Sequence, residues 1–121
     1  MIVASGIIAA SPAQSPATAE TSGTHTYRGN VGRHLATFEL HFESERRVTG
    51  SYRDESNGQT YELKGRNPPG RLLLDEYTRN QLTAHLDLSL ISSAREVRWE
   101  GTMNNVHPNT NTYPVSFARA P

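Results

Sequence analysis

The chain has 121 residues, of which 35% are hydrophobic and 20% charged, and this is the size and composition of one globular domain. The 12 Lys and Arg residues balance the 12 Asp and Glu residues, so no net charge favours binding to nucleic acid or to an anionic membrane. Cysteine is absent, which excludes disulfides, thiolate metal ligands and a cysteine nucleophile.

Residues 1–19 have the pattern of a signal peptide. A short apolar run, Ile2 to Ala10, precedes small residues, and Ala17-Thr18-Ala19 forms an A-x-A cleavage site. The run is shorter than the roughly 20 apolar residues that a membrane-spanning helix needs. No Lys or Arg precedes it, so a disordered small-residue leader is the alternative. We therefore expect a periplasmic or secreted protein without a membrane span.

From Thr24 onward, apolar and polar residues alternate, and Gly, Pro, Asn and Asp interrupt the pattern at short intervals. This pattern is typical of antiparallel strands joined by tight turns. The clearest pair is VTGSYRDESNGQTYELKGR, where Asn57-Gly58 marks a hairpin turn. We predict eight strands, at residues 24–29, 35–42, 48–53, 60–66, 71–77, 82–90, 96–103 and 113–118.

Each predicted strand has one apolar face and one polar face. The apolar positions are Tyr27, Ala36, Phe38, Leu40, Phe42, Val48, Tyr52, Tyr61, Leu63, Leu72, Leu74, Ala84, Leu86, Leu88, Leu90, Val97, Trp99, Met103, Val115 and Phe117. Eight such strands in succession form either a two-sheet β-sandwich or a closed barrel. We predict an all-β, antiparallel up-and-down meander barrel in residues 20–121, because only closure removes both unpaired edges.

Gly50, Gly65 and Gly101 fall on the apolar faces of three different strands. Glycine inside a strand weakens it unless a bend or a close approach requires it. Small barrels need such bends because their strands must coil sharply to close. We expect the three glycines to serve this purpose, and chance placement is the alternative.

Several short motifs carry a resemblance to a known class of protein. They are Tyr27-x-Gly29-x-x-Gly32, Val48-x-Gly50-x-Tyr52, Leu63-x-Gly65, Leu72-x-Leu74-x-Glu76 and Trp99. This pattern resembles small exported bacterial domains of poorly defined function with a lipocalin-like or avidin-like β-barrel. The hairpin at residues 48–66 is also similar to an avidin hairpin, but avidins surround biotin with several tryptophans and this chain has one. The resemblance implies a binding barrel, and it implies neither biotin binding nor an enzyme.

No pattern of residues indicates a cofactor, a metal site or a catalytic nucleophile. The histidines do not stand at H-x-H or H-E-x-x-H spacing, and no serine lies in a G-x-S-x-G elbow. Glu76 is the notable charge, because its parity places it inside the barrel, where it needs an Arg, a Tyr hydroxyl or water as partner. Glu76 either ties the barrel end together or contacts a ligand, and in an enzyme it would be the acid or base.

Two groups of residues are candidates for binding. Inside the lumen, they are Tyr27, Tyr52, Tyr61, Glu76 and Trp99. At one end, loops 30–34, 54–59, 78–81 and 104–112 meet, and the candidates on this rim are Asn57, Arg79, Asn80, Asn104, Asn105, His107, Asn109 and Asn111.

Three functions follow from these features. The preferred one is a non-catalytic binding module, monomeric or weakly oligomeric, whose filled barrel presents loops to a macromolecular partner, for example as an inhibitor of an envelope-acting enzyme. The alternatives are a lipocalin-like carrier of a small apolar ligand and an enzyme that uses Glu76. A cavity of about 300 Å³ or more inside the barrel would favour the carrier.

Overall fold

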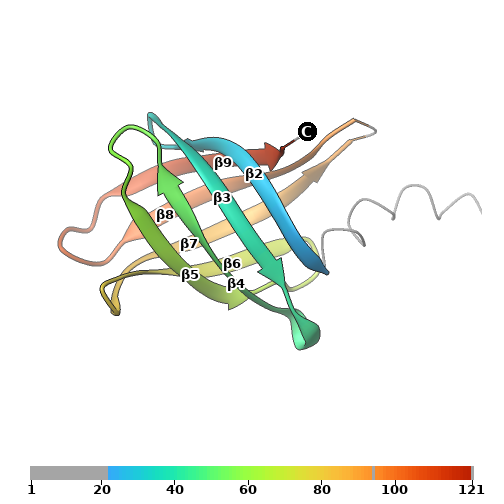
Figure 1. The fold of residues 1–121 in the computed structure, drawn as a ribbon, viewed down its shortest axis with the longest axis horizontal. Helices are drawn as coiled ribbons and strands as arrows, with labels where there is room; N and C mark the ends of the chain where they lie inside the picture. Colours follow the sequence, from blue (N-terminus) through green and yellow to red (C-terminus); the bar gives the residue numbers. More distant parts are fainter. Residues whose placement is uncertain (1–21, 94, 121) are drawn as a thin grey trace, which may run out of the picture.

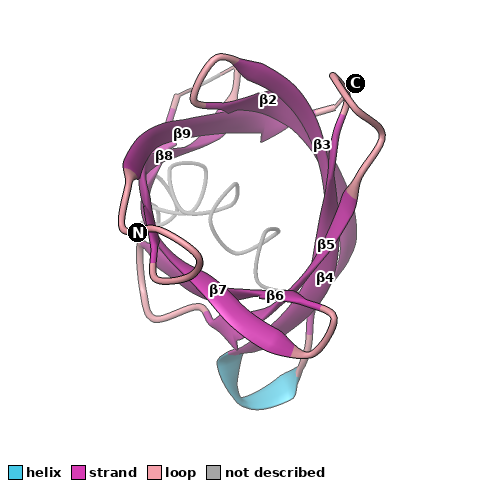
Figure 2. Cartoon of the chain, turned by 90° about the vertical axis from the view of Figure 1, so that its left-hand side faces the viewer, coloured by secondary structure: helices cyan, strands magenta, loops and turns pink. Residues whose placement is uncertain are grey.

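The computed structural model describes residues 22–93 and 95–120, and the leader expected at residues 1–19 lies outside them. Eight antiparallel strands form a closed barrel in which every strand pairs with its neighbours in the chain (Figures 1 and 2). The strands are β2 (Gly23–Val31), β3 (His34–Phe42), β4 (Arg47–Asp54), β5 (Thr60–Arg66), β6 (Arg71–Thr78), β7 (Gln81–Ser92), β8 (Val97–Asn105) and β9 (Thr112–Arg119).

Pairing between the first and last strands closes the barrel. The register of β2 against β9 runs from Tyr27 opposite Arg119 to Val31 opposite Val115. The predicted up-and-down barrel is therefore confirmed and the two-sheet sandwich is wrong. Within the described residues, no helix has the length and the apolar character that crossing a bilayer requires.

The turns gather at two opposite ends of the barrel. We call one end the mouth, which is formed by the turns β2–β3, β4–β5, β6–β7 and β8–β9 at the left of Figure 1. The other end, the base, contains the remaining turns and the short 3-10 helix η2 (Ser44–Arg46). The loops predicted to share one end do lie together at the mouth.

The core consists of the apolar positions predicted from strand parity. Three of the predicted positions, Tyr61, Leu90 and Val97, are half-buried, and the others are buried. The ring of Phe38 lies between two aromatic neighbours, with centroid distances of 4.1 Å to Phe117 and 4.9 Å to Tyr52. These stacked rings fill the middle of the barrel.

The three inward glycines lie where a neighbouring strand comes too close for any side chain. A Cβ atom at Gly65 would lie 1.9 Å from the carbonyl oxygen of Leu73, and those at Gly50 and Gly101 would lie 2.1 Å and 2.0 Å from a carbonyl oxygen of the adjacent strand. Their position is therefore not chance, because the strands could not approach in this way with side chains present.

We expect Gly65→Ala to lower the free energy of unfolding by about 1–3 kcal/mol, because the added methyl group must push the backbone of β6 away. Chemical denaturation followed by tryptophan fluorescence measures the change. Ser89→Ala, on the exposed face of β7, is the control and should change stability by less than about 0.5 kcal/mol. If Gly65→Ala had the same free energy of unfolding as the wild-type protein, β5 and β6 would be able to move apart at this point without a cost in stability.

One irregularity in the sheet positions the site described below. Between β6 and β7, Glu76 lies opposite Ala84 and Tyr77 lies opposite Leu82, so Thr83 is an extra residue in β7. This β-bulge breaks the alternation of the strand, and Thr83 and Ala84 are both buried. The hydroxyl group of Thr83 thus lies inside the barrel beside Glu76.

Candidate functional site

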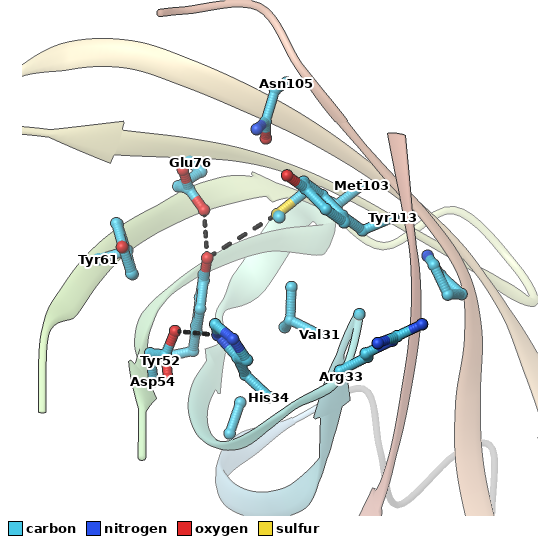
Figure 3. Close-up of a pocket in the computed structure, with 13 residues that line it drawn as sticks. Val31, Arg33, His34, Tyr52, Asp54, Tyr61, Glu76, Met103, Asn105 and Tyr113 are labelled. Carbon is cyan, nitrogen blue, oxygen red and sulfur yellow. Dashed lines mark hydrogen bonds and ion pairs between the residues drawn. The ribbon is translucent and has the colours of Figure 1, made fainter. Parts of the chain in front are cut away.

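A cavity of about 590 Å³ opens at the mouth and extends into the barrel (Figure 3). Its volume lies within the range of about 300–1,000 Å³ that is typical of small-molecule sites. Its walls come from the strand ends and from the β2–β3 turn. The lining residues are Val31, Gly32, Arg33, His34, Ala36, Tyr52, Asp54, Tyr61, Glu76, Met103, Asn105, Tyr113 and Pro114.

The rest of the lumen is packed. Tyr27 and Trp99, two of the predicted lumen residues, are buried among core side chains and do not line this cavity. The ring of Tyr27 contacts that of Phe117 at a centroid distance of 5.2 Å. The indole nitrogen of Trp99 is buried without a hydrogen-bond partner among the described residues. The barrel is therefore filled toward its base and hollow at its mouth.

Glu76 is a buried acidic residue on the wall of this cavity, with only 5% of its surface exposed. The hydroxyl group of Tyr52 donates a hydrogen bond to Glu76 Oε2, and that of Thr83 donates one of 2.7 Å to Oε1. The Tyr52 hydroxyl also lies 3.8 Å from the sulfur atom of Met103. A tyrosine hydroxyl was one of the partners expected for Glu76, whereas Thr83 reaches it only because of the bulge in β7.

Burial and negative charge act together on the tyrosines of the cavity. Burial is the largest cause that raises the pKa of Tyr52 above its usual value of 10.0, and the charge of Glu76 is the next. Burial, Glu76 and Asp54 likewise raise the pKa of Tyr61, whose ring stacks on that of Tyr52 at 4.8 Å. Both hydroxyl groups therefore remain protonated at neutral pH, in a region of negative potential.

Asp54 and His34 form a second polar group nearer the opening. His34 Nδ1 lies 2.9 Å from Asp54 Oδ2, and Asp54 Oδ1 accepts hydrogen bonds from the backbone and hydroxyl of Ser56 at 2.9 Å and 2.6 Å. Burial opposes ionisation, but the hydrogen bonds from Ser56 and His34 outweigh it and lower the pKa of Asp54 below 3.8. Arg33, in the β2–β3 turn, adds one guanidinium group to the lining.

The predicted rim residues lie at the mouth, but of these only Asn105 lines the cavity. Arg79 and Asn80 form the tight β6–β7 turn, where both have positive φ, of 52° and 68°. Asn57 Oδ1 accepts a hydrogen bond of 2.8 Å from the backbone of Gln59. These three residues shape turns outside the cavity.

The asparagine-rich loop between β8 and β9 is held largely by its own amides. Asn109 Oδ1 accepts hydrogen bonds from the side chain of Asn105 at 3.2 Å and from the backbone of Asn111 at 2.9 Å. Asn104 Oδ1 accepts one of 2.9 Å from Thr112. The backbone of His107 contacts the carbonyl oxygen of Thr83 at 3.4 Å. Many of the polar groups expected to recognise a partner are thus engaged within the loop or with β7.

The sequence identified Tyr52, Tyr61 and Glu76 as lumen residues and missed most of the other lining residues. Ala36 and Met103 were recognisable in part, because both have inward parity near a strand end at the mouth. Asn105 was predicted as a rim residue and lines the cavity, whereas no signal in the sequence distinguishes Arg33 or His34 from residues of an ordinary turn. Among the described residues, no three His, Asp or Glu side chains are grouped so as to hold a metal ion.

Comparisons with protein-family models, with curated proteins and with solved structures find no significant match to this chain. The fold and the site therefore define the class of protein by themselves: an eight-stranded up-and-down β-barrel with a hollow mouth and a buried carboxylate in its wall.

Proposed function

We propose that this chain is a non-catalytic binding protein that takes a small organic ligand into the cavity at the barrel mouth. The observation that carries the proposal is the open cavity of about 590 Å³, with an apolar wall and one buried carboxylate. Such a cavity is typical of ligand sites, which combine apolar lining with a few placed polar groups. The lipocalin-like and avidin-like resemblance of the sequence supports the same proposal.

The lining favours an amphipathic ligand. Val31, Ala36 and Met103 offer apolar surface, and the rings of Tyr61 and Tyr113 offer flat faces for an alkyl or aryl body. The polar groups of the lining would meet the ligand's polar atoms. With the leader expected from the sequence, such a carrier would act in the periplasm or outside the cell.

A macromolecular partner at the rim has less support. The loop at residues 104–112 forms hydrogen bonds largely within itself, and of the predicted rim residues only Asn105 lines the cavity.

Catalysis is the second candidate function, because two carboxylates, Asp54 and Glu76, line the same cavity. Catalysis has less support than binding because both carboxylates are already hydrogen-bonded within the protein, Asp54 to His34 and Glu76 to Tyr52 and Thr83.

Native mass spectrometry of the protein purified from its own source tests the proposal. We expect a small molecule that stays bound under native conditions and is released on denaturation. Val31→Trp should reduce its occupancy or affinity at least tenfold, because the indole ring would fill the mouth of the cavity. Leu35→Trp is the matched control: Leu35 is 65% exposed and does not line the cavity, so binding should not change. Equal occupancy in wild type and Val31→Trp would contradict the proposal.

A further inference from the structure

We infer that the ligand of this cavity has a cationic nitrogen, as in a primary amine or an amidine, which binds to the carboxylate of Glu76. This inference rests on the binding function proposed above and specifies the head group of the ligand. Four observations support it: the free acceptor positions of Glu76, its lack of a cation, the aromatic wall and the balance of charge in the lining.

Glu76 has unused hydrogen-bonding capacity. An ionised carboxylate accepts about four hydrogen bonds, two at each oxygen. Tyr52 occupies one position at Oε2 and Thr83 occupies one at Oε1. Since Glu76 lines the cavity, a ligand inside can reach the carboxylate, and a group with several N–H donors would complete its acceptor set.

Glu76 also lacks a cationic partner. Among the described residues, none forms an ion pair with Glu76, although only 5% of its surface is exposed. A buried carboxylate without a cation is costly, and a charge brought by a ligand would offset that cost. The other carboxylate of the lining, Asp54, already has His34 beside it at 2.9 Å.

The aromatic wall and the charge balance favour the same sign of charge on the ligand. The stacked rings of Tyr52 and Tyr61 and the ring of Tyr113 line the cavity, and tyrosine faces attract cations. The lining contains two carboxylates, Asp54 and Glu76, and one arginine, Arg33. Its histidine, His34, is already paired with Asp54. The raised pKa of Tyr61, to which Glu76 and Asp54 both contribute after burial, reflects the negative potential of this region.

Three molecules of similar size test the inference: 2-phenylethylamine, 2-phenylethanol and phenylacetate. Each is titrated at pH 7 into the isotopically labelled protein, and affinity and location are read from NMR shifts of the cavity residues, including the Met103 methyl group. We expect the amine to bind in the cavity at least tenfold more tightly than the alcohol, and phenylacetate to bind most weakly.

The variant Glu76→Gln identifies the group responsible. Glutamine retains an acceptor oxygen and the size of the side chain but removes the charge, so amine and alcohol should then bind with equal affinity. Glu62→Gln removes the same charge from an exposed position on β5 and should leave the preference for the amine unchanged.

The outcomes separate the inference from the function on which it rests. If the alcohol binds in the cavity as tightly as the amine, the cationic head group is wrong and the binding function stands. Tighter binding of phenylacetate would also overturn the inference and point to Arg33 as the anchor. If none of the three shifts the cavity residues, the proposed function itself is contradicted. The comparison in the wild-type protein decides these cases even if Glu76→Gln does not fold.

Discussion

Replacing Phe38 by alanine will lower the free energy of unfolding by about 3–5 kcal/mol, the range measured when a buried aromatic ring is deleted from a core. Phe38 has no exposed surface, and its ring stacks on those of Phe117 and Tyr52. Alanine would leave a cavity between these two rings, in the middle of a barrel that has a single core. A domain of this size has a total stability of about 5–15 kcal/mol, so the loss is a large fraction of it.

Urea denaturation followed by the fluorescence of Trp99 measures this loss. The chain has one tryptophan, and its side chain is buried, so its emission will report the unfolding of the barrel. Leu35→Ala is the control, because Leu35 is 65% exposed and its truncation should cost less than about 0.5 kcal/mol. A loss below 1 kcal/mol for Phe38→Ala would mean that the neighbouring rings collapse into the space.

Raising the pH above 10 will destabilise the protein through Tyr52. The pKa of this hydroxyl group is raised in the folded state, chiefly by burial and then by Glu76, above its usual value of 10.0. Between these two pKa values the unfolded chain releases the proton and the folded chain retains it. The contribution of Tyr52 to stability is therefore complete below pH 10 and declines above it, by about 1.4 kcal/mol per pH unit.

The comparison of wild type with Tyr52→Phe isolates this effect. Between pH 8 and pH 11 the wild-type protein should lose about 1.4 kcal/mol more of its unfolding free energy than the variant, which has no hydroxyl group to ionise. Tyr61→Phe should show a smaller difference of the same sign, since Tyr61 is half-buried and its pKa is also raised. Equal losses in wild type and Tyr52→Phe would show that Tyr52 ionises as readily in the folded protein as in the unfolded chain.

Strand alternation predicted the barrel because nearly every strand has one face inside and one outside. The observed strands extend beyond the predicted ones by up to two residues at an end. Only β8 begins later than predicted, at Val97 instead of residue 96. Thr83 shows where alternation fails. Parity places it outside, next to the inward Ala84, but the bulge turns it inward, and neither glycine nor proline marks the bulge in the sequence.

The candidate site was predictable only in part, because parity gives the side of the sheet and not the depth within the barrel. Tyr52 and Trp99 share the inward parity, yet Tyr52 lines the cavity and Trp99 lies in the packed core. The difference depends on how side-chain volumes add up at each level of the lumen. That sum involves residues from strands distant in the chain, such as Ala36 and Met103 at the mouth.

The pairing of β2 with β9 has a consequence for how the protein is made. Of the eight strands, β2 is synthesised first, and it finds its second partner only in β9, the last strand. Contacts between such distant segments form slowly, because a long loop must be closed before they gain any stability. During synthesis the growing chain therefore keeps one side of its first strand unpaired, and the barrel cannot close until the final strand has been translated.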